Sequence, residues 1–170
     1  MRGLLVAQFL GAFNDNAWKL IVALLSIRVV EQQLGASGPA FEAASQSQTT
    51  LAFVVFTLPL VIFSLPAGLL ADRFSKRSVI VAMKALEVVL MACGAAALWL
   101  APEGRVAPLV VLGLMGLQAA LFSPAKYGIL PELLSHERLS AGNAQLEMWT
   151  FLAIVAGTGA GGALLAAAGA

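Results

Sequence analysis

Long apolar stretches separated by short polar ones restrict the fold of this chain more than any other feature. Crossing a hydrocarbon core takes about 20 apolar residues in a helix. Five stretches qualify, at about residues 3–27, 49–71, 79–100, 106–122 and 144–169. Backbone groups in lipid must be paired within their own segment, and these stretches lack the alternation typical of barrel strands. We therefore predict an all-α, polytopic membrane bundle with about five transmembrane helices.

The composition supports a lipid environment and argues against several other partners. The chain has 170 residues, of which 60% are hydrophobic and 11% charged, whereas soluble domains carry about 25% charged residues. The formal net charge of +1 leaves no basic stripe for nucleic acid. The single Cys93 excludes a disulfide within the chain and gives no support to a zinc site. We expect the lipid bilayer as a partner, with no nucleic acid, metal or cofactor.

The connections between the predicted helices differ in character. Residues 28–48 form a polar loop with glycine and proline, whereas residues 74–78 form a short basic turn. A second short turn is expected around Pro102 and Gly104. A longer connection is predicted at 123–143, with a short interfacial helix in its middle.

The distribution of lysine and arginine predicts the orientation in the membrane, since cytoplasmic loops are enriched in both. One side of the predicted bundle has only Arg28 and Arg105. The other side has six basic residues, namely Arg2, Arg73, Lys76, Arg77, Lys126 and Arg138. We predict that this second side, with the N-terminus, faces the cytoplasm, so the protein is expected to be a multi-pass membrane protein with a cytoplasmic N-terminus.

Polar residues inside a spanning segment are costly and therefore indicate function. Along the first segment, a stripe repeats at spacings of three and four residues, which places its members on one helical face. It consists of Gln8, Gly11, Asp15, Lys19 and Val22. Asp15 would lie roughly 18 Å along the helix, near the middle of the membrane. One interpretation is a polar cavity in which Asp15 binds substrate or a coupling ion, and Asn14 and Asn16 favour it. The alternative is a structural ion pair between Asp15 and Lys19.

Two other predicted segments also carry ionisable side chains. Lys84 and Glu87 are three residues apart and are expected to pair, and Lys84 is within snorkelling reach of the interface. We therefore favour a structural role for this pair. Glu147 lies near the start of the last segment, where a place in the cavity and a place at the interface are equally compatible with the sequence.

No arrangement of residues in the sequence predicts an enzyme. The single histidine, His136, is not followed by the aspartate that an acyltransferase motif would need, since Ala141 stands five residues on. Gly157, Gly159, Gly161 and Gly162 lie in an apolar segment without the lysine of a nucleotide-binding loop. Their small size instead predicts close helix packing in lipid.

The segment GLLADRFSKR at residues 68–77 resembles the major facilitator signature G-x-L-A-D-R-x-G-R-R between the second and third helices. It departs from that pattern at Ser75, where glycine is usual. The resemblance implies the N-terminal half of a major facilitator transporter. It also implies a conformational gate in which the aspartate faces a helix of the opposite half while the basic residues fix the hairpin. The implied gate residues are Gly68, Asp72, Arg73, Lys76 and Arg77.

Two further segments narrow the resemblance to one family. The segments QFLGAFNDNA at residues 8–17 and AKYGILPEL at residues 125–133 look like those of bacterial lysophospholipid transporters. Membership would imply lysophospholipid transport across the inner membrane by alternating access, with relatives fused to acyltransferase and acyl-carrier synthetase domains. It would also place Asp15 in the substrate path and Lys126 against the phosphate or an acidic partner.

The family has twelve helices, so the resemblance predicts that seven helices, including the C-terminal half, are missing from this chain. An isolated five-helix piece is expected to be inactive. Two alternatives stay open at this stage. One is efflux of drugs or small metabolites, and the other is a non-transporting membrane anchor for a fused phospholipid acyltransferase.

Overall fold

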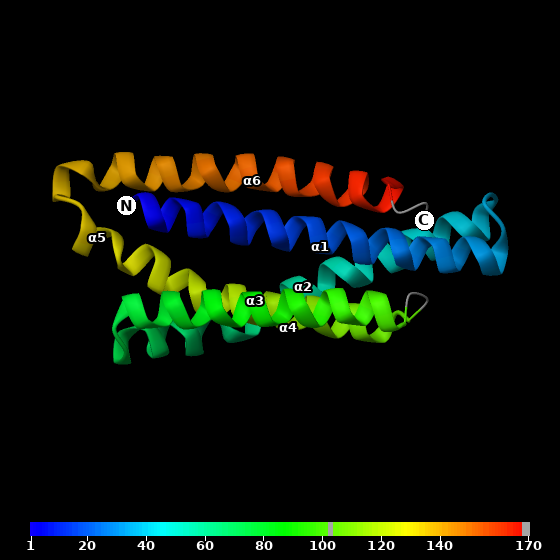
Figure 1. Cartoon of the computed structure of the whole chain (residues 1–170), viewed down its shortest axis with the longest axis horizontal. Helices are drawn as coiled ribbons and strands as arrows, with labels where there is room; N and C mark the ends of the chain where they lie inside the picture. The colour runs from blue at the N-terminus through cyan, green and yellow to red at the C-terminus, as the bar shows by residue number, and fades with distance from the viewer. Residues whose placement is uncertain (102–103, 168–170) are drawn as a thin grey trace.

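A computed structural model describes residues 1–101 and 104–167, and the described residues form a bundle of helices (Figure 1). The long helices are α1 (Arg2–Leu34), α2 (Pro39–Arg73), α3 (Lys76–Leu100), α4 (Val106–Gly128) and α6 (Leu139–Ala167). The short ones are α5 (Leu130–Leu133) and the 3₁₀ helix η1 (His136–Arg138). The all-α bundle predicted from the sequence is confirmed. The predicted turn residue Pro102 and the end of the last predicted segment, residues 168–169, lie outside the described residues.

Successive long helices run in opposite directions along the bundle (Figure 1). The N-terminus, the α2–α3 connection and the α4–α6 connection therefore lie at one end, and the α1–α2 and α3–α4 connections lie at the other. This alternation brings the basic residues of the hairpin at 72–77 to the same end as Arg2 and Arg138.

Four helical stretches of the described chain are long and apolar enough to cross a membrane, namely α2, α3, α4 and His136–Ala167. Helix α1 was predicted as a fifth span but is not among these four. Its 33 residues give it a length of about 50 Å, and its polar stripe distinguishes it from the other long helices. The crossing of the membrane by α1 therefore stays a prediction.

The predicted loop at 28–48 is wrong, because both flanking helices continue through most of it. The actual turn between α1 and α2 comprises residues 35–38. Gly35 and Gly38 adopt φ angles of 84° and 106°, which side chains with a Cβ rarely adopt. Pro39 then opens α2, where its missing N–H costs no helical hydrogen bond. The polar side chains of this region end the apolar stretches but do not end the helices. The helices are interrupted only at the turn that contains Gly35 and Gly38.

Two of the other three connections are also shorter than predicted. The hairpin between α2 and α3 is reduced to Phe74 and Ser75, and Ser75 caps α3 by accepting a hydrogen bond from the Ser78 N–H at 3.2 Å. Helix α4 continues to Gly128, so the predicted loop at 123–143 is wrong in its first part, although α5 is a short helix in its middle. Lys126 therefore lies in the last turn of α4 and not in a loop, and Arg28, counted on the opposite side, likewise lies in α1.

Glycines allow the helices to approach one another closely. A Cβ at Gly157 of α6 would meet the backbone carbonyl of Phe13 in α1, and one at Gly161 would lie 2.7 Å from the carbonyl oxygen of Ala17. Likewise, a Cβ at Gly116 of α4 would meet the carbonyl of Phe56 in α2. Helix packing was the role predicted for the α6 glycines, and it holds for Gly157 and Gly161. A Cβ at Gly159 would instead meet open space.

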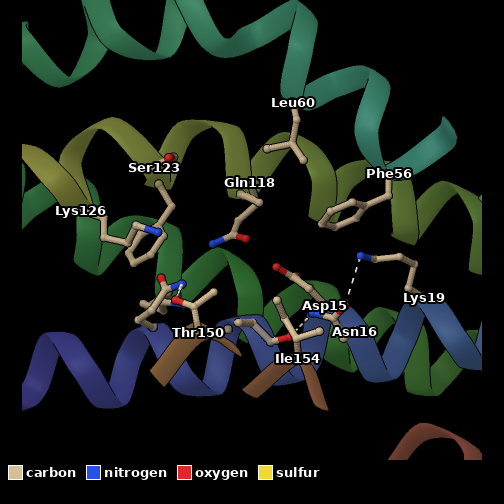
Figure 2. Close-up of a pocket in the computed structure, with 16 residues that line it drawn as sticks. Asp15, Asn16, Lys19, Phe56, Leu60, Gln118, Ser123, Lys126, Thr150 and Ile154 are labelled. Carbon is tan, nitrogen blue, oxygen red and sulfur yellow. Dashed lines mark hydrogen bonds between the residues drawn. The ribbon is translucent and has the colours of Figure 1, made fainter. Parts of the chain in front are cut away.

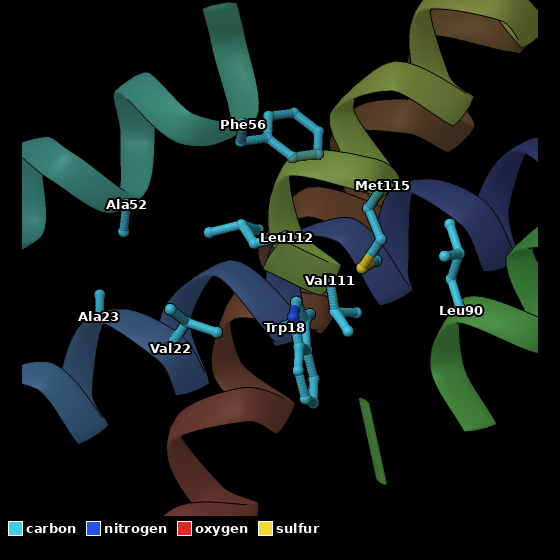
Figure 3. Packing of buried hydrophobic residues seen from close by; sticks show 9 residues of the cluster. All are labelled: Trp18, Val22, Ala23, Ala52, Phe56, Leu90, Val111, Leu112 and Met115. Atoms are coloured by element: carbon cyan, nitrogen blue, oxygen red, sulfur yellow. The ribbon is translucent and has the colours of Figure 1, made fainter. Parts of the chain in front are cut away.

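A compact apolar core joins α1, α2, α3 and α4 on the side of the α1–α2 connection (Figure 3). Trp18 is 3% exposed and donates its indole N–H to the carbonyl of Pro108 at 3.3 Å. Leu112 and Met115 are fully buried beside it. Phe56 belongs to this core and also lines the cavity described next.

Candidate functional site

A cavity of about 290 Å³ lies in the middle of the bundle, and all five long helices contribute to its wall. Figure 2 shows Asp15 of α1 and Gln118 of α4 pointing towards one another across it. The residues that line the cavity are Gln8, Gly11, Ala12, Asp15, Asn16, Lys19, Phe56, Leu60, Lys84, Gln118, Ala119, Phe122, Ser123, Lys126, Thr150 and Ile154.

Helix α1 turns its predicted polar stripe into this cavity. Gln8, Gly11, Asp15 and Lys19 all line the wall, and Asn16 joins them. The last member of the stripe, Val22, packs into the apolar core instead. The spacing of three and four residues was therefore sufficient to predict which face of α1 is polar.

Asp15 and Lys19 do not pair with each other. Among the described residues, ion pairs join only Lys84 with Glu87 and Lys76 with Glu132. The Lys19 ammonium donates to Asn16 Oδ1 at 3.3 Å and lies 4.3 Å from the ring centroid of Phe56. Asp15 Oδ1 is buried and accepts no hydrogen bond from the described part of the chain. A carboxylate in this position is available to a cationic ligand.

Helix α4 forms the opposite wall with Gln118, Ser123 and Lys126. Lys126 is 8% exposed, and its ammonium lies 4.4 Å from the ring centroid of Tyr127. Gln118 donates to the carbonyl of Met83 in α3 at 3.1 Å. Sequence reasoning missed Gln118, although a single amide inside an apolar segment was a usable signal.

Lys84 of α3 also lines the cavity, which the structural role favoured for its pair with Glu87 did not predict. It pairs with Glu87 as predicted, with 2.6 Å between the Lys84 ammonium and Glu87 Oε2. Asn14 of α1 donates to the other oxygen of Glu87 at 2.9 Å. Asn14 therefore faces α3 and does not line the cavity, so its predicted place in the substrate path stays a prediction.

Glu147 likewise does not line the cavity. It accepts a hydrogen bond from the hydroxyl of Tyr127 and so joins α6 to the end of α4, next to Lys126. One turn further along α6, Thr150 does line the cavity and accepts a hydrogen bond from Gln8 at 2.8 Å. Of the six residues predicted for the path, the structure brings together Asp15, Asn16, Lys19 and Lys126.

The predicted gate segment lies apart from the cavity, at the end of the bundle that holds the N-terminus. Gly68 is in α2, and Asp72 and Arg73 end that helix with exposed side chains. Lys76 starts α3 and pairs with Glu132 of α5 at 2.9 Å, while Arg77 is exposed. The aliphatic part of Lys76 packs on Gly128, because a Cβ there would lie 2.9 Å from it.

Apolar helices of alternating direction (Figure 1) around a charged cavity define a multi-pass membrane protein with ionisable side chains at its centre. Comparison with known families agrees with this class. The model of the Major Facilitator Superfamily matches residues 4–170. The chain therefore belongs to the Major Facilitator Superfamily, as the signature at 68–77 predicted.

Several similar proteins are named as lysophospholipid transporters. The chain is 35% identical over 164 residues to the Lysophospholipid transporter LplT of Salmonella paratyphi B, and equally to those of Salmonella heidelberg and Salmonella enteritidis PT4. These matches cover 96% of this chain and 36% of each relative. The chain thus spans little more than a third of their length. No solved structure matches the chain.

Proposed function

We propose that the full-length protein containing this chain transports lysophospholipids across the bacterial inner membrane by alternating access. The observation that carries the proposal is a cavity with one carboxylate and three ammonium groups inside a bundle of apolar helices. A lysophospholipid needs this combination, because its headgroup is charged and its single acyl chain is apolar. The similarity to proteins named lysophospholipid transporters supports the same substrate class.

Asp15 and Lys126 would recognise the two charges of a zwitterionic headgroup. The buried carboxylate of Asp15 suits an ammonium, and the buried ammonium of Lys126 suits a phosphate. They belong to α1 and α4, so a bound headgroup would join the two walls of the cavity. Alternating access would then expose the site to each side in turn, as one helical half rocks against the other.

The hairpin at the N-terminal end would serve as the gate. The exposed Asp72 and Arg73 are available to a helix of the opposite half, whereas Lys76 is already fixed to α5. The excess of basic residues at this end favours its placement in the cytoplasm. An acyltransferase or acyl-carrier synthetase, fused or associated, would be a suitable partner on that side.

Lysophospholipid uptake into proteoliposomes that contain the full-length protein tests the proposal. Asp15→Asn is expected to abolish uptake, because the amide removes the negative charge and nearly preserves the shape. Protein yield and the elution profile on size exclusion control for folding. Full uptake by the variant would remove Asp15 from the mechanism. Failure of the wild-type protein to move any lysophospholipid would refute the function itself.

A second measurement concerns the chain alone. The 170-residue chain is expected to show no uptake in the same vesicles, because alternating access needs a second helical half. Transport by the chain alone would contradict this mechanism.

A further inference from the structure

We propose that Lys84 is a third recognition residue of the cavity, which binds the phosphate of the substrate, and that Glu87 and Asn14 position it. The inference deepens the proposed function and rests on it. It assigns a ligand-binding role to a lysine for which the sequence favoured a structural ion pair.

The exposure of the ion pair is asymmetric. The side chain of Lys84 is 23% exposed, whereas that of Glu87 is 6% exposed. Lys84 lines the central cavity and Glu87 does not. Both residues also line a second pocket between α1 and α3, but only Lys84 reaches the central cavity. A ligand in the central cavity would therefore meet the ammonium and not the carboxylate.

Lys84 keeps donors for such a ligand. An ammonium has three N–H donors, and Glu87 Oε2 accepts one of them at 2.6 Å. The ammonium also lies 4.4 Å from the ring centroid of Phe122, which lines the same cavity. The remaining donors suit the oxygens of a phosphate, which readily accepts charge-assisted hydrogen bonds.

Glu87 is held from behind by α1. Asn14 donates to Glu87 Oε1, so both carboxylate oxygens have a partner. Gly11 leaves the space that this arrangement needs, because a Cβ there would meet the Lys84 ammonium and would lie 3.3 Å from Glu87 Oε2. The glycine, the asparagine and the glutamate thus fix the ammonium at the cavity wall.

The charges of the cavity wall also point to an anion. Lys19, Lys84 and Lys126 line it together with a single carboxylate, Asp15. Among the described residues, only Lys84 of these three forms an ion pair. Positive charge that is buried without an equal number of carboxylates is costly, and a bound phosphate would offset that cost.

The test compares lysophosphatidylethanolamine transport by variants of the full-length protein in proteoliposomes. The double variant K84Q/E87Q removes both charges, so it leaves no unpaired charge behind. Loss of a charge-assisted hydrogen bond to phosphate is expected to raise KM by about tenfold or more, with a smaller change in the maximal rate. K84R, which keeps the charge, is expected to retain most of the affinity.

E87Q separates binding from a purely structural role. The amide keeps a similar shape, and its oxygen can still accept a hydrogen bond from Lys84. Its nitrogen can donate to Asn14 Oδ1 if the Asn14 amide turns over. Without a negative charge it competes less with the phosphate for Lys84. The proposal therefore expects a lower KM for E87Q, opposite in sign to the effect of K84Q/E87Q. A merely structural pair would lower the thermal stability of both variants and leave KM unchanged.

The outcomes distinguish this inference from the function on which it rests. If the wild-type protein moves lysophosphatidylethanolamine and K84Q/E87Q does so with the same KM, the role of Lys84 is refuted and the proposed function stands. If the wild-type protein moves no lysophospholipid, the proposed function fails first. A monoacylglycerol of the same chain length, which lacks phosphate, should show no difference in transport between wild-type and K84Q/E87Q protein, and an equal loss would overturn the inference.

Discussion

Two consecutive stretches of α1 face two different interiors, although α2, α3 and α4 contribute to both (Figures 2 and 3). From Gln8 to Lys19, α1 lines a charged cavity. From Trp18 to Ala23, it packs into an apolar core. Phe56 marks the boundary between the cavity and the core, because its ring packs in the core and also lies near the Lys19 ammonium.

The difference suggests separate tasks for the two regions: the apolar core stabilises the fold, and the charged cavity serves transport. In the core, fully buried side chains such as Leu112 have no polar groups to satisfy. In the cavity, Asp15 Oδ1 is buried with no hydrogen bond from the described chain, and such a group destabilises the fold. We therefore expect core substitutions to lower stability, and cavity substitutions to impair transport with little loss of stability.

The largest effect is expected from Trp18→Ala in the core. Loss of a buried tryptophan should lower the free energy of unfolding by about 3–5 kcal/mol, because Trp18 is 3% exposed and also bonds to Pro108. Thermal unfolding in detergent measures the effect. Trp99→Ala is the matched control, since Trp99 is 85% exposed. Equal losses for the two variants would contradict the assignment of the core.

A smaller loss is expected from Gly157→Ala, at the contact between α1 and α6. The added methyl group would meet the backbone carbonyl of Phe13, and such overpacking costs about 1–3 kcal/mol. Gly159→Ala, two residues away and facing open space, should leave the melting temperature unchanged or raise it. If Gly157→Ala is as stable as Gly159→Ala, the close approach of α1 and α6 is wrong.

Asp15→Asn should behave in the opposite way from the core variants. The free energy of unfolding is expected to stay the same or to rise by about 1 kcal/mol, because an amide is less costly to bury than a carboxylate. The same thermal assay that detects Trp18→Ala measures it. A loss as large as that of Trp18→Ala would show that Asp15 supports the fold, and the contrast between the two regions would then fail.

The smallest effect is expected at the end of the bundle. Lys76 and Glu132 pair at 2.9 Å, but their side chains are 31% and 56% exposed. Lys76→Gln should therefore lower the free energy of unfolding by only about 0.2–1 kcal/mol, and less at high salt. Arg77→Gln serves as the control, because Arg77 forms no ion pair within the described chain. A loss well above 1 kcal/mol would require that Lys76 also supports the core.

Sequence patterns predicted the fold better than its boundaries. Apolar length identified the helices, and the polar stripe of α1 predicted which face of it lines a cavity. Helix ends were wrong at 28–48 and at 123–143, because helices continue through polar residues until a glycine or a cap ends them. Lys126 was expected in a loop for this reason. It lies in α4 instead, where it lines the cavity.

The sequence by itself determined an all-helical membrane bundle, the superfamily and the candidate carboxylate Asp15, because apolar length and helical spacing are local properties of the chain. Only the tertiary structure decided which polar groups share the cavity. Lys84 and Gln118 come from other helices than Asp15, and Asn14, its neighbour in sequence, faces Glu87 instead. Those assignments depend on how the helices are rotated against one another, which is decided by glycine contacts and hydrogen bonds between residues far apart in the chain.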